Sequence, residues 1–172
     1  MGRTLTRMAV QILERNKGTD NLVLIGIRTR GVPIANRLSQ IISNLEKGKS
    51  VKCGTLDISL YRDDFMTGAK MTEVRATEID FDINGCNVVL VDDVLYTGRT
   101  ARSAIHGILD FGRPATIQLA VFIDRGHREM PIQGDFVGRS IVTSPGEEVR
   151  VHVKETDGVD EVVLVEEYED DE

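Results

Sequence analysis

The sequence predicts an α/β protein in which a mainly parallel central sheet is flanked by helices. Short runs of consecutive apolar residues indicate strands that are buried on both faces, as parallel strands are. Segments with apolar residues every three or four positions alternate with these runs, which is the order of a parallel sheet with helical crossovers. The 172 residues suffice for one domain. We therefore expect a single domain over residues 1–165 and a disordered acidic tail over residues 166–172.

In the first half of the chain, helical and strand patterns alternate. The segment Thr4–Asn16 has helical spacing, and Asn21–Ile27 is an apolar run typical of a buried strand. A second helix is expected over Pro33–Lys47, because proline suits the first turn of a helix. In Thr55–Tyr61 apolar and polar residues alternate, which predicts a strand with one polar face.

The second half begins with a long polar segment, Arg62–Thr77, which has no regular period and is interpreted as a mobile loop. A buried strand is expected over Asn87–Val94, a helix over Thr100–Phe111, and another buried strand over Thr116–Asp124. Further short strands, some of them antiparallel additions at the C-terminal end, are expected at Phe136–Val137, Ser140–Val142, Val149–Lys154 and Val162–Val165.

The composition excludes several classes of protein. A net charge of −7 argues against a generic nucleic-acid-binding surface but allows a local basic patch. Cys53 and Cys86 are too few for a disulfide framework or a metal site, and we expect both to be reduced. No apolar run approaches the roughly 20 residues that span a bilayer, and no signal-peptide pattern opens the chain. We therefore expect a cytoplasmic protein.

The segment Val88–Thr100 carries the clearest functional signal. Two adjacent acids, Asp92 and Asp93, end a buried strand, and a glycine-containing turn then leads into a helix. The start of a helix offers N–H groups and a favourable dipole to a phosphate, and carboxylates accept hydrogen bonds from a sugar diol. The alternative is a solvated strand end followed by an ordinary helix cap. The agreement of strand, acids, turn and helix favours a site for a phosphorylated sugar.

This segment resembles the 5-phosphoribosyl-1-pyrophosphate (PRPP) binding motif of the type I phosphoribosyltransferases. The resemblance implies that Asp92 and Asp93 hold the ribose hydroxyls and that Tyr96–Thr100 cradles the 5′-phosphate. It also implies the type I phosphoribosyltransferase fold, with a small C-terminal β region called the hood. The residues that match the motif are Val88, Val89, Leu90, Val91, Asp92, Asp93, Val94, Leu95, Tyr96, Thr97, Gly98, Arg99 and Thr100.

Arg28-Thr29-Arg30-Gly31 follows the first buried strand and is therefore expected at the same sheet edge as the acidic pair. Guanidinium groups present forked donors to phosphate oxygens, whereas in isolation such a loop is more often a charged surface turn. In the family this is the pyrophosphate loop, and Thr29, Arg30 and Gly31 match it.

In phosphoribosyltransferases a loop after the next strand closes over the site and excludes water. That strand and loop correspond here to Leu56–Asp64, in which Arg62 is the cation best placed to follow the departing pyrophosphate. The alternative for Arg62 is an exposed ion pair with Asp63 or Asp64.

A second specific segment, Phe122–Ile132, leaves another buried strand. Together with the preceding motifs, it resembles the family of bifunctional pyrimidine operon regulatory proteins and uracil phosphoribosyltransferases. We expect backbone groups at Ile123, Asp124 and Arg125 to read the base, although Asp124 could be a plain strand-end carboxylate. Hypoxanthine-type enzymes carry Asp where this chain has Tyr96, and a tyrosine cannot accept a proton in that way at pH 7. The resemblance therefore implies conversion of uracil and PRPP to UMP and pyrophosphate, with Mg²⁺ held through the substrate and possible help from Asp92 and Asp93.

Members of this family also bind pyrimidine operon leader mRNA, with UMP strengthening the binding, and so attenuate transcription. A homodimer or higher homo-oligomer is implied. Val10 and Gln133 depart from the family pattern, since a His and an Arg are common at these two positions. The loss of two potential cations matters because phosphate contacts dominate RNA affinity. The positions that match family RNA contacts are Thr6, Arg7, His127, Arg128 and Arg139.

The RNA positions leave alternatives open. The three arginines are equally compatible with solvated surface charges, and His127 is compatible with capping a turn or pairing with Glu129. Three interpretations therefore stand: a bifunctional regulator and enzyme, a phosphoribosyltransferase that has lost RNA binding, and a regulator with vestigial catalysis. The intact catalytic segments disfavour the third.

Overall fold

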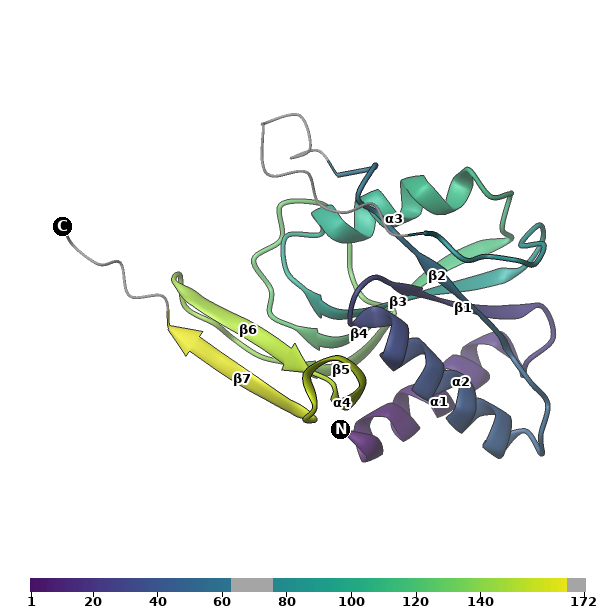
Figure 1. Cartoon of the computed structure of the whole chain (residues 1–172), viewed down its shortest axis with the longest axis horizontal. Coiled ribbons are helices and arrows are strands. Elements are labelled where there is room, and N and C mark those ends of the chain that lie inside the picture. The colour runs from purple at the N-terminus through teal and green to yellow at the C-terminus, as the bar shows by residue number, and fades with distance from the viewer. Residues whose placement is uncertain (63–75, 167–172) are drawn as a thin grey trace.

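The computed structural model of the protein describes residues 1–62 and 76–166. Its centre is a five-stranded sheet in the order β2-β1-β3-β4-β5, and every pair of neighbouring strands in it is parallel (Figure 1). The apolar runs of β1, β3 and β4 are buried in the interior of this sheet, as predicted. The strands are β1 (Leu22–Ile27), β2 (Lys52–Leu56), β3 (Asn87–Leu95), β4 (Thr116–Asp124) and β5 (Phe136–Ser140).

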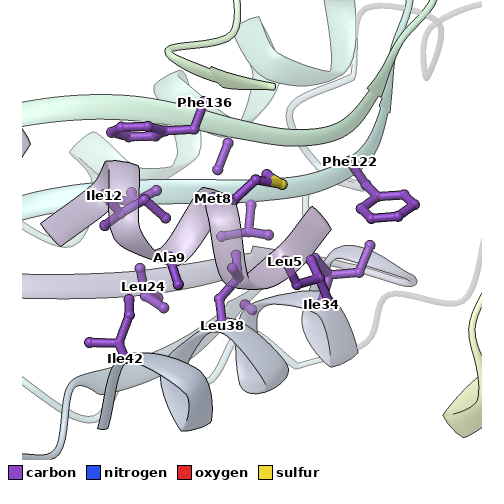
Figure 2. Packing of buried hydrophobic residues seen from close by; sticks show 14 of the residues in the cluster. Leu5, Met8, Ala9, Ile12, Leu24, Ile34, Leu38, Ile42, Phe122 and Phe136 are labelled. Atoms are coloured by element: carbon purple, nitrogen blue, oxygen red, sulfur yellow. The ribbon is translucent and has the colours of Figure 1, made fainter. Parts of the chain in front are cut away.

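Helices cover both faces of the sheet, because alternate strand residues point in opposite directions. On one face, Leu22 and Leu24 of β1 pack with α1 (Gly2–Asn16) and α2 (Gly31–Leu45). Figure 2 shows this layer, in which Met8 and Leu38 are among the side chains that meet between the helices and the strands. On the other face, the intervening residues of β1 and β3 pack with α3 (Arg99–Leu109). Among the described residues, no helix is long and apolar enough to cross a membrane.

The hood, residues 147–166, consists of β6 (Glu147–His152), the short helix α4 (Lys154–Asp157) and β7 (Glu161–Glu166). β6 and β7 form an antiparallel pair that is separate from the central sheet and extends from one side of the body (Figure 1). The side chains of Val149, Val151 and Val153 anchor the hood in the cluster beneath α1 and α2. The expected antiparallel strands are therefore present, but they form a second sheet.

Several predicted boundaries were wrong. The second helix begins at Gly31, two residues before Pro33, and ends at Leu45. The expected strand over residues 55–61 is instead β2, which ends at Leu56 opposite the last residue of β1. Leu56 and Ile58 are buried, but Leu60 is 64% exposed, so the alternation does not continue.

Further corrections concern the C-terminal third. The two short strands expected at residues 136–137 and 140–142 are one strand, β5, because it pairs with β4 from Ala120 to Asp124. Glu166 lies opposite Glu147 in the hood and is not part of a tail. Most of the expected loop, residues 63–75, and the rest of the expected tail, residues 167–172, lie outside the described residues.

The strand order places a topological switch point between β1 and β3. The connection through α2 leads to β2 on one side, and the connection through α3 leads to β4 on the other. Ligands of open parallel sheets bind at the carboxyl ends of strands at such a point. The pairing of β1 with β3 stops at Gly26 and Val91, so β3 extends past its neighbour there. This extension contains the predicted acidic pair.

Candidate active site at the carboxyl edge of the sheet

The loop after β1 lies unusually close to β3. A Cβ atom placed on Gly31 would lie 2.3 Å from the carbonyl oxygen of Val91 and 3.3 Å from the Cα of Asp92. A Cβ on Gly26 would lie 2.5 Å from the Cα of Val32 and would collide with the same turn. Both glycines are therefore needed to bring the predicted pyrophosphate loop against the acidic pair. Gly31 was a predicted site residue, whereas Gly26 was not.

The acidic pair lies within the last part of β3, where Asp92 Oδ1 accepts the N–H of Asp93 at 2.9 Å and Asp93 Oδ1 accepts the N–H of Val94 at 2.9 Å. Asp92 retains some exposed surface, but the protein packs densely around its carboxyl group. This burial and the neighbouring charge of Asp93 raise the pKa of Asp92 well above its usual value. A pair of adjacent carboxyl groups of this kind suits hydrogen bonding to a sugar diol.

The two arginines of the loop after β1 point to different partners. Arg28 donates to the carbonyl oxygen of Ala76 at 3.0 Å and approaches Glu78, so it faces away from β3. Arg30 forms a bidentate ion pair with Asp157 of the hood. Arg30 and Asp93 both line a cavity of about 420 Å³ that lies between the end of β3 and β6.

The turn between β3 and α3 is held in place by the loop that follows β4. The carbonyl oxygen of Thr97 accepts the N–H groups of Glu129 at 2.8 Å and Met130 at 3.0 Å. Gly98 adopts a φ of 90°, and a Cβ there would approach Met130 at 3.1 Å. The N–H groups of the first turn of α3 have no acceptor within the helix. One of them, the N–H of Arg99, lies 3.3 Å from Thr97 Oγ1, and the turn remains the candidate phosphate cradle.

A second cavity of about 400 Å³ adjoins the first, since Val94, Glu148 and Val149 line both. Arg125 and Tyr96 line this second cavity together with Glu147 of the hood. The guanidinium carbon of Arg125 lies 3.9 Å from the centre of the Tyr96 ring. Arg125 is 8% exposed, and its Nη2 donates to the carbonyl oxygen of Glu147. Its Nε is buried without a hydrogen-bond partner among the described residues. This cavity is therefore lined by an aromatic and a cationic residue in contact with each other.

The backbone at the end of β4 is less available than the sequence suggested. The N–H of Arg125 donates to the carbonyl oxygen of Leu95 at 3.0 Å, and the carbonyl oxygen of Asp124 accepts the N–H of Ile141 at 2.9 Å. Ile123 is buried in the ladder between β3 and β5. Of the three predicted base-reading residues, Arg125 reaches the cavity, and it does so with its side chain.

Asp124 and Arg128 form an ion pair at 2.6 Å that closes the loop after β4. Burial acts to raise the pKa of Asp124, but hydrogen bonds from Arg128 and from the N–H of Gly126 outweigh it and lower the pKa below the usual range. Arg128 also donates to the carbonyl oxygens of Ile132 at 2.7 Å and Tyr96 at 2.9 Å. The Arg128 guanidinium is therefore engaged by the protein itself.

The remaining predicted RNA residues occupy two places. On α1, Thr6 is exposed, and Arg7 donates to the carbonyl oxygens of Val137 and Gly138 in β5. Arg139 of β5 is exposed. His127 adopts a left-handed backbone with a φ of 59°, and its Nε2 lies 2.8 Å from the carbonyl oxygen of Thr143.

Arg62 is exposed and is the last described residue before the gap. Among residues 1–62 and 76–166, no group of three or more His, Cys, Asp or Glu side chains is placed to hold a metal ion. The oxygens of Asp92 and Asp93 nevertheless suit a hydrated Mg²⁺ that takes its other ligands from a substrate. Cys53 and Cys86 are both free thiols.

Asp157, Glu147 and Glu148 lie at the candidate site although the sequence did not predict them there. The contact between Asp157 and Arg30 joins residues 127 positions apart, and the cavity lining by Glu147 and Glu148 depends on the placement of the hood. No local motif could have identified either. Gly26 could have been suspected, since a lone glycine inside a buried strand often marks a close backbone approach.

Comparison with known proteins places this geometry in a family. Residues 1–156 match the model of the phosphoribosyl transferase domain. Among solved structures, a hypoxanthine phosphoribosyltransferase of Trypanosoma cruzi has a TM-score of 0.70 at 21% identity, covering 96% of this chain and 91% of that one. A hypoxanthine-guanine phosphoribosyltransferase of Bacillus anthracis has a TM-score of 0.64 at 20% identity, covering 85% and 80%. These likenesses support the fold.

Curated relatives are much more similar in sequence. The bifunctional protein PyrR of Pelotomaculum thermopropionicum is 58% identical over 164 residues, which are 95% of this chain and 90% of that protein. The PyrR proteins of Thermus aquaticus and Clostridioides difficile are 54% and 52% identical, and the matches cover 95% and 96% of this chain and 90% and 93% of those proteins. The chain therefore belongs to the phosphoribosyl transferase family and, within it, to the bifunctional PyrR proteins.

Proposed function

We propose that this protein is a uracil phosphoribosyltransferase that also regulates pyrimidine biosynthetic operons by UMP-dependent binding of leader mRNA, attenuating transcription in the cytoplasm. The observation that carries the enzymatic part is the meeting of three elements at one switch point. These are the Arg28–Gly31 loop, the Asp92–Asp93 pair and the first turn of α3. They supply donors for a diphosphate, acceptors for a ribose diol and N–H groups for a phosphate, which together are the binding needs of PRPP.

In the proposed reaction, N1 of uracil forms a bond to C1′ of PRPP while the bond from C1′ to the diphosphate oxygen breaks. The diphosphate leaves with the bonding electron pair, and the N1 proton passes to solvent. Asp92 and Asp93 orient the ribose, and the turn before α3 holds the 5′-phosphate. Arg30 stabilises the negative charge that develops on the diphosphate. Bound Mg²⁺ would neutralise the diphosphate, with Asp92 and Asp93 as the carboxylates nearest to it.

The cavity lined by Tyr96 and Arg125 is the proposed base site. Uracil offers two carbonyl oxygens, and the guanidinium of Arg125, a residue that lines this cavity, carries N–H donors that suit them. Tyr96 contributes an aromatic surface and cannot serve as a base at neutral pH.

The test of catalysis is pyrophosphate release from PRPP and Mg²⁺ with uracil, orotate, hypoxanthine, guanine and adenine offered in parallel. We expect release with uracil alone. Release with a purine would overturn the base assignment, and release with none would shift the proposal to a regulator that binds nucleotides without turning them over.

The regulatory part rests on the membership in the PyrR family and on the matching positions Thr6, Arg7 and Arg139. An enzyme without RNA binding is the second candidate, favoured by the internal hydrogen bonds of Arg7 and Arg128 and by Val10, an exposed apolar residue. A filter-binding titration with pyrimidine leader RNA, with and without UMP, separates the two. Binding that UMP strengthens and salt weakens supports regulation, whereas binding no tighter than to an unrelated RNA supports the second candidate. Sedimentation would test the proposed homodimer or higher homo-oligomer.

A further inference from the structure

The guanidinium of Arg30 is held along one edge by a hood carboxylate. Nη2 of Arg30 lies 2.8 Å from Oδ1 of Asp157, and Nε lies 3.1 Å from Oδ2. This bidentate pairing orients the planar group as well as attracting it. Asp157 comes from α4, whereas Arg30 caps α2 and belongs to the loop against β3. The contact therefore joins the hood to the proposed diphosphate site.

Asp157 is positioned by contacts that do not involve Arg30. Its Oδ2 accepts the N–H of Val153 at 2.8 Å, which fixes the carboxylate against its own turn. The same segment is held to α2 by Arg37, which forms ion pairs with Glu155 and with Asp160 at 2.7 Å. Arg30 and Asp157 thus meet because the hood is docked on α2 at a second point. The Asp157 carboxylate is thus preorganised to accept hydrogen bonds from the Arg30 guanidinium.

The other edge of Arg30 remains available. Within the described part of the chain, Nη1 of Arg30 takes part in no hydrogen bond or ion pair. Arg30 lines the cavity of about 420 Å³ beside Asp93, and its side chain is 37% exposed. A guanidinium has five N–H donors in a fixed fork, so it can hold a carboxylate on one edge and a phosphate on the other.

We propose that Asp157 is a positioning residue for diphosphate recognition: it holds Arg30 by one edge and directs the free edge into the cavity between β3 and the hood. This inference rests on the proposed function, because it takes the diphosphate of PRPP or free pyrophosphate as the ligand. It makes the hood part of the diphosphate site in two ways, because Asp157 orients Arg30 and residues 148–152 of β6 line the same cavity. A second consequence is that hood placement and diphosphate affinity are coupled.

The test is calorimetric binding of Mg²⁺-pyrophosphate to the full chain, together with the KM values for PRPP and for uracil. In Asp157→Ala we expect pyrophosphate affinity to fall about tenfold and the KM for PRPP to rise by a similar factor. A tenfold loss of affinity is the lower end of what removal of an orienting partner causes at a binding site. The KM for uracil should stay near that of the wild type. Asp157→Glu, which keeps the charge, should restore part of the affinity.

The matched control is Asp160→Ala, which removes an acid from the same segment that pairs with Arg37 and not with Arg30. It should leave pyrophosphate affinity within about twofold of the wild type, because Glu155 still pairs with Arg37 and keeps the hood docked on α2. In an Arg30→Ala background, Asp157→Ala should have no further effect, since the two residues act as one unit. Circular dichroism and thermal unfolding identify a variant that fails to fold, in which case Asp157→Asn replaces it.

The outcomes separate the inference from the function on which it rests. If the wild type neither binds pyrophosphate nor turns over PRPP, the proposed function and the inference both fail. If the wild type does both while Asp157→Ala behaves like it, or if the two substitutions are additive, only the inference fails. Tighter pyrophosphate binding by Asp157→Ala would also overturn it, because Asp157 would then compete with the ligand for Arg30.

Discussion

The guanidinium of Arg125 lies over the ring of Tyr96, and its central carbon is 3.9 Å from the ring centre. This distance is well within the range of a cation–π contact. It ties the end of β4 to the turn that precedes α3, and so connects the proposed base site to the proposed phosphate site. Two residues that lie in separate motifs of the sequence thereby form one wall.

Replacing Arg125 by Lys should weaken uracil recognition selectively. A lysine keeps the charge but loses the planar stacking and the fork that donates to Glu147. Because a desolvated cation–π contact contributes about 0.5–2 kcal/mol, we expect the KM for uracil to rise about tenfold. Steady-state kinetics with each substrate varied in turn would measure this. Tyr96→Phe is the control, since it keeps the ring, and an unchanged uracil KM in Arg125→Lys would remove Arg125 from the base site.

The close approach of Gly31 to β3 predicts that Gly31→Ala abolishes most turnover. A Cβ at 2.3 Å from the Val91 carbonyl oxygen cannot be accommodated unless backbone moves, and the loop that carries Arg30 must then shift. We expect a fall of at least about a hundredfold in kcat/KM for PRPP, as small displacements of positioning groups produce. Gly2→Ala on α1 is the control, because a Cβ there meets nothing within 4 Å. Activity of Gly31→Ala close to the wild type would contradict the described approach of the loop.

The raised pKa of Asp92 predicts a specific dependence of stability on pH. The folded protein retains a proton that the unfolded chain loses above its ordinary pKa of 3.8, so this group favours folding below that pH. Its contribution is lost as pH rises through the folded-state pKa. Asp92→Asn should therefore stabilise the protein by about 0.5–2 kcal/mol at pH 8, with the difference shrinking toward pH 4, while turnover falls strongly.

Urea unfolding of the wild type and of Asp92→Asn between pH 4 and pH 8 would measure that difference. Asp93→Asn serves as the comparison, because it removes the repulsion on Asp92 and leaves the buried carboxyl in place. A constant difference between the wild type and Asp92→Asn at every pH would show that Asp92 does not titrate as described.

Arg128 and Arg139 should behave differently although both match RNA-contact positions. Arg128 is engaged by Asp124 and by three carbonyl oxygens, so Arg128→Ala should cost about 1.5–3 kcal/mol of stability. We expect it to lower turnover as well as RNA binding. Arg139→Ala removes an exposed charge, and should leave turnover intact while reducing RNA affinity and its dependence on salt.

Chemical denaturation, pyrophosphate release and filter binding on both variants would check this. The stability that the Asp124 pair provides is present above the ordinary pKa of Asp124 and is lost as pH falls through its lowered folded-state pKa. The difference in stability between the wild type and Arg128→Ala should therefore shrink in strong acid to the part contributed by the carbonyl hydrogen bonds. If Arg128→Ala lost only RNA binding, the internal hydrogen bonds of Arg128 would not be important for stability or turnover.

The sequence by itself determined the architecture and the location of the candidate site. Apolar runs and helical spacing are local properties, and they placed β1, β3, β4 and the helices between them in the correct order. In a parallel sheet the carboxyl ends of neighbouring strands share one edge, so the sequence alone predicts that Arg30 and Asp93 lie near each other. The glycine-containing turn at Gly98 likewise predicted the start of α3 within one residue.

Only the tertiary structure decided which partner each charged group has. The pairing of Arg30 with Asp157 spans 127 positions, and the stacking of Arg125 on Tyr96 requires the ends of two strands to be in register. Periodicity also failed at Leu60, because the strand ends where its neighbour β1 ends. The physical reason is the same in each case: a pattern along the chain reports which face a residue presents, whereas packing between distant segments decides what that face meets.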